Sequence, residues 1–555
     1  MCRPTRQTNP KRLLQIIGEL EPTLTLIERV DSIKYIALSY CWGTAQNLKT
    51  LTTNIHLRKS GIKWEELTKT LRDAIEVARW VGIDYIWVDS LCILQDSKAD
   101  WDAESIKMGE IYTNAFLVLA ASSAADCTSG FLGPRPYLFQ QDFMLMNNHL
   151  GHPPYTIRLR DPLNHSGIVG FNENSKASSE PLSQRAWAFQ ERVLASRLLS
   201  FGVNELVWAC QRKAYCECGQ ARYDAKKEKR AHPKYLRPLV MDQWDNDKVY
   251  REWRQNIIFN FTKRQLTVTS DRLPALAGIA SRIRQKTGDR YLSGIWEGDL
   301  PRALLWELAP VERAADFSRE CDLPTFSWAS VERPVQYSAL LNRFVSQAKY
   351  LSSRGTYSLF ETTDDTQNSQ IVLQGRLLPA LACLSRHHPS DPERYYIVPA
   401  EIDITASFRA DGEYQGNYFT ADLPLISETD GTTSYSYPSI FRPKSHLLKN
   451  QVSSTLLHRA PQMGNNLEWF SCWCLLIGKV HQQEDAEIYS SPTSQFVYMT
   501  DEVYYALVLC RSKSKENVFE RLGLFQTDIP KGNTLHVRWR KAWNSVKTRS
   551  NVTII

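Results

Sequence analysis

The sequence predicts an α/β domain with an at least partly parallel sheet in its N-terminal part, followed by a mixed α+β middle region and a β-rich C-terminal region. Short apolar strand patterns alternate with helical periodicity between about residues 35 and 122. After about residue 335, strand-like segments alternate with polar loops. The chain has 555 residues, 43% of them hydrophobic. That length is enough for large cores in roughly two to four domains.

The N-terminal elements follow the order strand, helix, strand, helix, strand, which is typical of a sheet with parallel strands. The expected strands begin at Tyr35 and cover residues 83–89 and 115–122. The first expected helix has apolar residues from Leu67 to Val81 and ends at Gly82. The second runs from Trp101 to about Asn114, and Ser97 and Asp100 before it are cap candidates.

A third patterned segment covers residues 181–210. Ser183 is placed to cap a helix that continues to about Leu194. The strand patterns RLLSF and ELVWAC follow, and the Gly-Val-Asn between them predicts a hairpin. The polar residues 164–183 are expected to form the loop that leads into this segment.

Composition and charge exclude several classes of protein. Charged residues are 23% of the chain and the net charge is +7, a mild excess whose densest run, residues 225–230, is typical of a solvated loop. We therefore expect no nucleic-acid partner. No stretch approaches the ~18 apolar residues of a membrane helix, so we expect no membrane segment. The 12 cysteines are scattered and no secretory signal is evident, which predicts reduced thiols in an intracellular, cytoplasmic protein.

No motif implies a resident metal or cofactor. Cys210, Cys216 and Cys218 lie near His232, but their C-x5-C-x-C spacing differs from standard zinc arrangements, so no metal site is predicted. Walker, dinucleotide-binding and G-x-S-x-G patterns are missing from the sequence.

Polar and aromatic residues follow the first two predicted strands. Ligands of open α/β sheets sit beyond the carboxyl ends of the strands, so these residues could share one crevice. The alternative is that the aromatic rings are packing residues, Asp89 caps a turn and Cys92 is an ordinary buried thiol. The candidates are Ser39, Tyr40, Trp42, Gly43, Asp89, Cys92, Gln95 and Asp96.

Three long segments resemble the fungal HET (heterokaryon incompatibility) domain family. They are YIALSYCWG (residues 35–43), the run from LRDAIEVARW to GEIYTNA (residues 71–115) and RAWAFQERVLASRLLSF (residues 185–201), in the family's order. Shorter segments between residues 264 and 525 resemble downstream parts of large HET proteins. The resemblance implies allorecognition between fused fungal cells. The domain would act as an effector of programmed cell death, with a protein partner or self-association.

HET domains are distantly similar to TIR domains, and YIALSY resembles the first TIR strand. Some TIR domains cleave the nicotinamide–ribose bond of NAD with a glutamate that follows a tryptophan near the start of a helix. This resemblance implies an NAD glycohydrolase-like activity with NAD as substrate and points to Trp101 and Glu104. The TIR spacing commonly has three residues between Trp and Glu, whereas two separate Trp101 from Glu104.

Helical spacing gives an independent argument for Glu104. Trp101, Glu104, Met108 and Ile111 fall on or beside one face, so the carboxylate would lie next to an aromatic ring. There it could stabilise the charge of a breaking glycosidic bond. The alternative is a helix-surface pair with Lys107.

The third segment adds four polar or aromatic residues with two interpretations. They could line the same crevice, or they could clamp the helix to the sheet through an arginine–carboxylate pair. These residues are Arg185, Trp187, Gln190 and Glu191.

The sequence thus predicts an N-terminal extension over residues 1–29, a TIR/flavodoxin-like HET domain over residues 30–215, a mixed region over residues 216–335 and a β-rich region over residues 336–555. Two mechanisms compete. In the first, the domain is an enzyme that consumes NAD or a related nucleotide through Glu104. In the second, it is a binding module that assembles with itself or a partner without chemistry. A third interpretation is a housekeeping protein that retains the domain.

Overall fold

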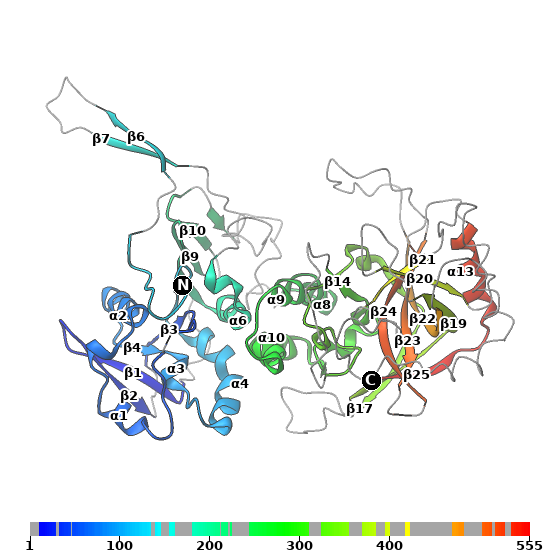
Figure 1. Cartoon of the computed structure of the whole chain (residues 1–555), viewed down its shortest axis with the longest axis horizontal. Helices are drawn as coiled ribbons and strands as arrows, with labels where there is room; N and C mark the ends of the chain where they lie inside the picture. The colour runs from blue at the N-terminus through cyan, green and yellow to red at the C-terminus, as the bar shows by residue number, and fades with distance from the viewer. Residues whose placement is uncertain are drawn as a thin grey trace, which may run out of the picture. The chain divides into compact units, whose positions relative to one another are not determined.

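The computed structural model describes residues 10–28, 33–45, 47–134, 139–145, 155–160, 180–210, 213–219, 222–224, 243–309, 323–354, 369–383, 394–399, 417–421, 469–481, 502–512, 515, 517–527 and 534–555. They fall into two compact units (Figure 1). The first unit comprises Met1–Asp245 and Lys263–Thr287, and the second comprises Asn246–Thr262 and Gly288–Ile555.

Among the described helices, none combines the length and the apolar character that crossing a membrane would require.

The first unit is built on a nine-stranded sheet whose four central strands are parallel. The strand order is β11-β10-β9-β8-β5-β3-β4-β1-β2, and β4, β3, β5 and β8 are the parallel strands. Antiparallel strands complete both edges. The strands are β1 (Arg12–Ile17), β2 (Thr23–Glu28), β3 (Ile36–Ser39), β4 (Tyr85–Trp87), β5 (Leu117–Ala120), β8 (Arg197–Phe201), β9 (Leu206–Cys210), β10 (Lys213–Cys216) and β11 (Arg222–Asp224). The partly parallel sheet predicted from the sequence is confirmed.

Helices cover the parallel strands on both faces. The crossover from β3 to β4 runs in one direction along the sheet, and the crossover from β4 to β5 runs in the other. Because such crossovers are right-handed, their helices must lie on opposite faces, as Figure 1 shows for α2 and α4. The helices are α1 (Ile55–Ser60), α2 (Lys69–Val81), α3 (Asp89–Cys92), α4 (Lys98–Asn114), α6 (Ala186–Leu194) and α10 (Ala277–Thr287). A separate hairpin pairs β6 (Phe139–Leu145) with β7 (Tyr155–Arg160).

Local sequence signals account for the ends of these helices. Gly82 ends α2 in the left-handed conformation, with φ 72°. The Ser97 side chain accepts a hydrogen bond from the Asp100 amide and caps α4, which begins before Trp101. The prediction that Ser183 caps the third helix is wrong. Residues Pro181–Gln184 form a 3-10 turn, and α6 begins after Arg185.

Glycines allow α4 to pack directly on α10. A Cβ atom on Gly109 would lie 2.4 Å from the Cα atom of Gly278, a distance that requires a shift of one backbone. The segment that carries α10 therefore returns to the first unit and packs against α4 and α6. Residues 263–287 belong with this unit although they lie far beyond the third HET-like motif.

We predict that Gly109→Ala destabilises the first unit by about 1–3 kcal/mol, because overpacking a close contact forces backbone shifts. Hydrogen exchange of peptides from α4 and α10 in the full chain would measure this change. Gly133→Ala is the control, since among the described residues nothing apart from its chain neighbours lies within 4 Å of its added Cβ. Equal stability of Gly109→Ala and wild type would contradict the packing argument.

The second unit contains a ten-stranded sheet that is mostly antiparallel. The pairings of β22, β19, β20, β21, β24 and β23 close into a ring, because β23 pairs with both β22 and β24. Its strands are β16 (Phe344–Ser346), β17 (Lys349–Arg354), β18 (Gln370–Gly375), β19 (Leu377–Cys383), β20 (Arg394–Pro399), β21 (Asn417–Ala421), β22 (Trp469–His481), β23 (Glu502–Arg511), β24 (Val518–Gln526) and β25 (Ser550–Ile554). The predicted β-rich C-terminal region is confirmed.

Short helices and strand pairs precede this sheet. Four tryptophans of this part, Trp253, Trp296, Trp306 and Trp328, are all buried. The elements are α8 (Asn246–Glu252), a π-helical turn η4 (Trp253–Ile258), α9 (Phe259–Thr262), β12 (Tyr291–Leu292), β13 (Ile295–Trp296), β14 (Trp306–Leu308) and β15 (Val335–Tyr337).

The sequence LHVRWR (residues 535–540) is one of the strand-like segments predicted after about residue 335, and this prediction is wrong. LHVRWR lies in helix α13 (Thr534–Ser545). Trp539 and Trp543, four residues apart, are both buried, and their rings pack 5.0 Å from each other and against Phe525. The six-residue pattern mimicked strand alternation, whereas burial at helical spacing over a longer window decides for the helix.

The domain limits predicted from the sequence stay predictions. The structure adds that residues 10–28, assigned to an N-terminal extension, contribute β1 and β2 to the sheet of the first unit. β1 pairs with β4, so it extends the parallel core directly.

Candidate functional site

Residues of all three HET-like motifs meet beyond the carboxyl ends of the parallel strands. Ser39 is the last residue of β3 and pairs with Ala120 at the end of β5. Asp89 follows β4 and begins α3, while Glu191 lies on α6. The chain connects β3 to β4 on one side and then passes to β5 on the other side of β3. Ligands of open α/β sheets bind where the connections reverse in this way. We define the polar cluster as Ser39, Tyr40, Trp42, Asp89, Ser90, Tyr112, Arg185 and Glu191.

Glu191 forms the buried part of the polar cluster. Its side chain is only 6% exposed and accepts a hydrogen bond from the Ser39 hydroxyl. The Tyr112 hydroxyl also hydrogen-bonds to Glu191 and lies 3.1 Å from the Leu38 carbonyl oxygen. Strand β3 and helices α4 and α6 therefore all contribute to the position of this carboxyl group.

Partly exposed residues form the outer part of the polar cluster. The Trp42 indole N–H lies 3.1 and 3.2 Å from the two carboxylate oxygens of Asp89. The backbone N–H of Ser90, in the first turn of α3, also donates to Asp89 at 2.7 Å. Arg185 donates to the Tyr40 carbonyl oxygen. A ligand approaching this edge would meet Trp42, Asp89 and Arg185 before Glu191.

One hydroxyl group and one side-chain amide hold the Tyr40 side chain in place. Its hydroxyl lies 2.9 Å from the Ser90 hydroxyl and accepts from the Asn47 side-chain amide at 2.9 Å. Burial raises the pKa of Tyr40 far above its usual value, so the phenol stays protonated. Tyr40 is therefore a structural part of the polar cluster that joins β3 to α3.

The two carboxyl groups of the polar cluster have raised pKa values. Burial raises the pKa of Glu191 to about 7, and the negative charge of Asp89 adds to this effect. The Ser39 and Tyr112 hydrogen bonds and the Arg185 charge oppose it. Burial likewise raises the pKa of Asp89, against the charge of Arg185. A carboxyl group with a pKa near neutrality can act as a general acid or base.

Four of the predicted pocket residues have contacts that stabilise the fold. Gly43 has φ 69°, and a Cβ there would lie 2.2 Å from that of Asp126, so the turn requires glycine. Gln95 donates to the carbonyl oxygens of Asp89 and Ile93 at 3.1 and 3.0 Å. Asp96 is exposed and accepts hydrogen bonds from Thr52.

Cys92 is the fourth of these residues, and it is buried. Burial raises the pKa of its thiol to about 12. At neutral pH the thiol is thus protonated, which argues against a nucleophile at this position.

Two residues of the third motif connect helices. The side-chain oxygen of Gln190 accepts a hydrogen bond from the Gly278 amide at 3.0 Å, which ties α6 to α10. The Trp187 indole donates to Asp271 at 3.1 Å, and its ring meets that of Trp101 edge to face at 6.2 Å. Trp101 is therefore in contact with another indole of the helix layer.

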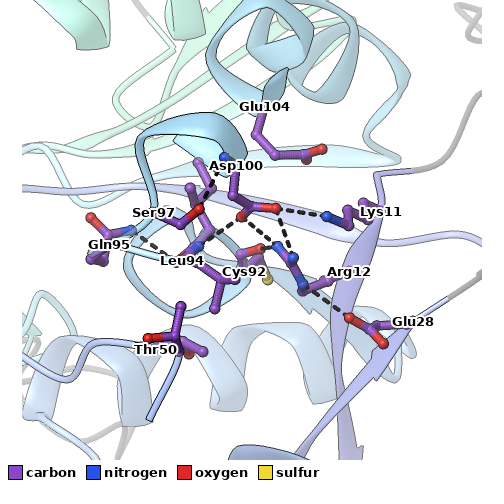
Figure 2. A network of polar contacts seen from close by, with 12 residues as sticks. Lys11, Arg12, Glu28, Thr50, Cys92, Leu94, Gln95, Ser97, Asp100 and Glu104 are labelled. Carbon is purple, nitrogen blue, oxygen red and sulfur yellow. Dashed lines mark hydrogen bonds and ion pairs between the residues drawn. The ribbon is translucent and has the colours of Figure 1, made fainter. Parts of the chain in front are cut away.

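Glu104 lies in a different environment from Glu191. It is 1% exposed, on the buried face of α4 as the spacing predicted, and it also contacts Lys107 at 3.4 Å. Its second oxygen, Oε2, has no hydrogen-bond partner among the described residues. Figure 2 shows Glu104 beside the network of Arg12 and Asp100, without a hydrogen bond to it. Both sequence interpretations of Glu104, the buried face and the Lys107 pair, describe its surroundings.

The structure singles out residues whose importance the sequence analysis missed. Ser90 and Tyr112 were not candidates, and Glu191 had no role of its own. One available signal pointed to Glu191. Three residues separate it from Trp187, which is the spacing implied by the TIR resemblance.

The fold and the polar cluster define an α/β domain with a buried carboxyl group at the reversal point of a partly parallel sheet. Residues 35–191 match the family model of the heterokaryon incompatibility protein (HET). This part of the chain is a HET domain, and the match associates the chain with heterokaryon incompatibility. No curated protein and no solved structure matches the chain.

Proposed function

We propose that this chain is an intracellular effector of fungal non-self recognition, whose HET domain causes cell death by cleaving NAD or a related nucleotide. We further propose that Glu191 is the catalytic carboxylate. The observation that carries the proposal is the buried Glu191, which has a pKa of about 7 and is hydrogen-bonded to Ser39 at the ligand-binding edge of the sheet.

The surrounding charges suit a nucleotide that carries a cationic ring and phosphates. Arg185 can pair with phosphate oxygens, as guanidinium groups commonly do. Trp42 is partly exposed and can stack on a planar base or a nicotinamide ring. Asp89 holds the Trp42 indole and adds negative charge near a cationic ring.

The reaction would proceed by cleavage of the bond between ribose carbon and nicotinamide nitrogen. The bonding electron pair leaves with nicotinamide, and the ribose carbon gains oxocarbenium character. The ionised Glu191 stabilises that positive charge across a short distance. Water then adds to the carbon, and its proton passes to Glu191 or to Asp89 before it reaches solvent. The products are nicotinamide and ADP-ribose.

Glu104 is the alternative catalytic residue, because the TIR resemblance first pointed to it. Its contact with Lys107 and its position beside a buried ion-pair network favour a structural role. The two glutamates are a matched pair for a test. Both are buried, both lie on helices of the same unit, and each can be replaced by glutamine.

The proposal predicts that Glu191→Gln lowers the rate of NAD loss by about 100-fold or more, while Glu104→Gln retains most of it. The full chain would be induced in a fungal host, with the variants at matched protein level. Cellular NAD would be measured before the membrane fails. The proposal is supported if NAD falls early in the wild type and in Glu104→Gln but not in Glu191→Gln. The opposite pattern transfers the role to Glu104.

A non-enzymatic assembly module is the competing function, and one observation favours it. Large apolar side chains are exposed in the first unit, with Trp80 on α2 at 70% and Leu20 between β1 and β2 at 93% exposed. Exposed apolar groups of this kind commonly mark interaction surfaces. Death of cells with intact NAD, together with loss of killing in Trp80→Glu, would favour assembly over catalysis.

A further inference from the structure

Three possible metal ligands meet at one edge of the first unit, separate from the polar cluster. Glu205 stands just before β9, Cys216 ends β10, and Cys218 lies in the turn that follows. One ligand atom from each residue lies within 4.8 Å of the other two. The two sulfur atoms are 3.1 Å apart. Glu205 and Cys216 are each 5% exposed, whereas Cys218 is partly exposed.

From this geometry we propose that Glu205, Cys216 and Cys218 bind one zinc ion. Zinc bonds to sulfur are about 2.3 Å and those to carboxylate oxygen about 2.0–2.2 Å, so two donors of one ion lie at most ~4.6 Å apart. The observed spacing therefore needs only small shifts, chiefly an opening of the two sulfur atoms toward the roughly 3.8 Å of a tetrahedral site. Among the described residues no fourth His, Cys, Asp or Glu joins this group, so the fourth ligand would be water or a further residue.

The backbone around the three ligands is held by the turn itself. The Cys218 amide donates to Glu205 at 3.2 Å, and Gly219, with φ 73°, closes the turn through a hydrogen bond to the Cys216 carbonyl oxygen. The Glu217 carboxylate accepts from the Leu206 amide at 2.9 Å, and the Glu217 amide donates to the Leu206 carbonyl oxygen at 2.9 Å. The Cys-x-Cys sequence thus presents two thiols with Glu205 between adjacent strands.

The donor set selects the class of metal. Two thiolates and one carboxylate are ligands that zinc accepts, whereas magnesium and calcium require oxygen donors. Binding converts two thiols to thiolates, so each zinc ion bound displaces two protons to the buffer when both thiols start protonated. No electron transfer is involved.

The strand register places this site at the carboxyl ends of the parallel strands, which is the end of the sheet where the polar cluster lies. Phe201, at the end of β8, pairs with Leu206, and Cys216 pairs with Val207. Because β8 is parallel to β5 and β3, the end of β8 lies at the edge where Ser39 ends β3. A zinc ion there would fix the turn after β10 to the start of β9, at the same end of the sheet as the candidate active site. This inference does not depend on the proposed nucleotide cleavage.

The register also provides a matched control. Cys210 was grouped with Cys216 and Cys218 by sequence spacing, yet it pairs with Arg197 at the far end of β9. With about 3.4 Å per residue along a strand, it lies roughly 10 Å further along β9 than Val207. Cys210→Ser changes a partly exposed cysteine of the same hairpin without touching the proposed ligands. His232, the other residue of that sequence cluster, lies outside the described residues.

The test is metal binding by the purified full chain under reducing conditions. Native mass spectrometry should find one zinc ion per chain, and cobalt substitution should give a thiolate-to-cobalt charge-transfer band. Cys216→Ser and Cys218→Ser should each weaken zinc binding by about 100-fold or more, and Glu205→Gln by about 10-fold. Cys210→Ser should bind like the wild type. Cys218→Ser alters a partly exposed residue, so its effect does not depend on the folding of Cys216→Ser.

Several results would overturn the zinc site. A wild-type chain that takes up no zinc while both thiols react with a thiol probe shows that the cluster is not a metal site. A disulfide between Cys216 and Cys218 in place of metal binding does the same. Equal losses in Cys210→Ser and Cys218→Ser reject the assigned ligands.

Discussion

Asp100→Ala is expected to destabilise the first unit by about 3 kcal/mol, because it removes both hydrogen bonds between a buried arginine and its buried counter-charge. The other carboxylate near Arg12, that of Glu28 at 3.2 Å, is partly exposed. Arg12 is 2% exposed and donates to both oxygens of Asp100 at 2.8 Å (Figure 2). Burial alone would raise the pKa of Asp100, but hydrogen bonds from Arg12 and Lys11 hold that pKa well below its usual value. Hydrogen exchange of β1 and α4 peptides in the full chain would measure the loss.

Asp102→Ala is the matched control on the same helix. Asp102 pairs with Lys98 at 2.8 Å, but the two side chains are 47% and 87% exposed. Exposed pairs of this kind contribute about 0.5 kcal/mol or less. Equal effects of the two alanine variants would refute the argument that burial of Arg12 makes Asp100 important.

A double replacement separates the cost of removing Asp100 from beside the buried Arg12 from the net contribution of the Arg12–Asp100 pair to stability. Arg12→Leu with Asp100→Leu should recover much of the stability lost in Asp100→Ala, since apolar residues often replace a buried ion pair with little loss. Incomplete recovery would measure the other contacts of these residues. Arg12 also donates to the Cys92 carbonyl oxygen at 2.9 Å, and Asp100 accepts from the Leu94 amide at 2.9 Å.

The Arg12–Asp100 pair also shows where sequence analysis of the fold stopped. Residues 35–122 were predictable because periodicity, a glycine stop and a serine cap all agree over that range. The role of residues 10–28 was not predictable, because an antiparallel edge strand is recognised only by its partner. Nothing local in the sequence states that Arg12 meets Asp100, 88 positions later. Helix α13 was predicted wrongly for the same reason, because its packing against Phe525 is a contact between residues distant in the sequence.

The sequence indicated where the candidate site lies, but it did not indicate which carboxyl group is buried in it. Strand ends rich in polar and aromatic residues indicated Ser39, Tyr40, Trp42 and Asp89, and these residues do lie together. The approach of α6 to β3, which brings Glu191 to Ser39, depends on a long connection and on the packing of three helices. Sequence spacing could therefore name Glu191 as a motif residue, but its burial and its neighbours required the structure.

Glu191→Gln is expected to stabilise the first unit relative to the wild type, by about 3 kcal/mol more at pH 8 than at pH 4. The folded-state pKa of about 7 is raised above the ordinary value of 4.5, mainly by burial. A carboxyl group with a raised pKa favours the folded state when protonated. The stability associated with Glu191 is thus fully present below about pH 4.5 and is lost as the pH rises through about 7. Glutamine stays neutral, so this loss is removed.

The measurement is the difference in unfolding free energy between wild type and Glu191→Gln at several pH values, read from hydrogen exchange of β3 and β5 peptides in the full chain. Subtracting the variant removes the contributions of other titrating groups. Ser39→Ala is the second variant. It deletes a hydrogen bond that lowers the pKa of Glu191, so the pH-dependent loss should move to higher pH. If the difference in unfolding free energy between wild type and variant is the same at pH 4 and pH 8, the pKa of Glu191 is not raised by folding. A variant that is more stable at neutral pH yet unable to deplete NAD would show that the raised pKa is retained for catalysis.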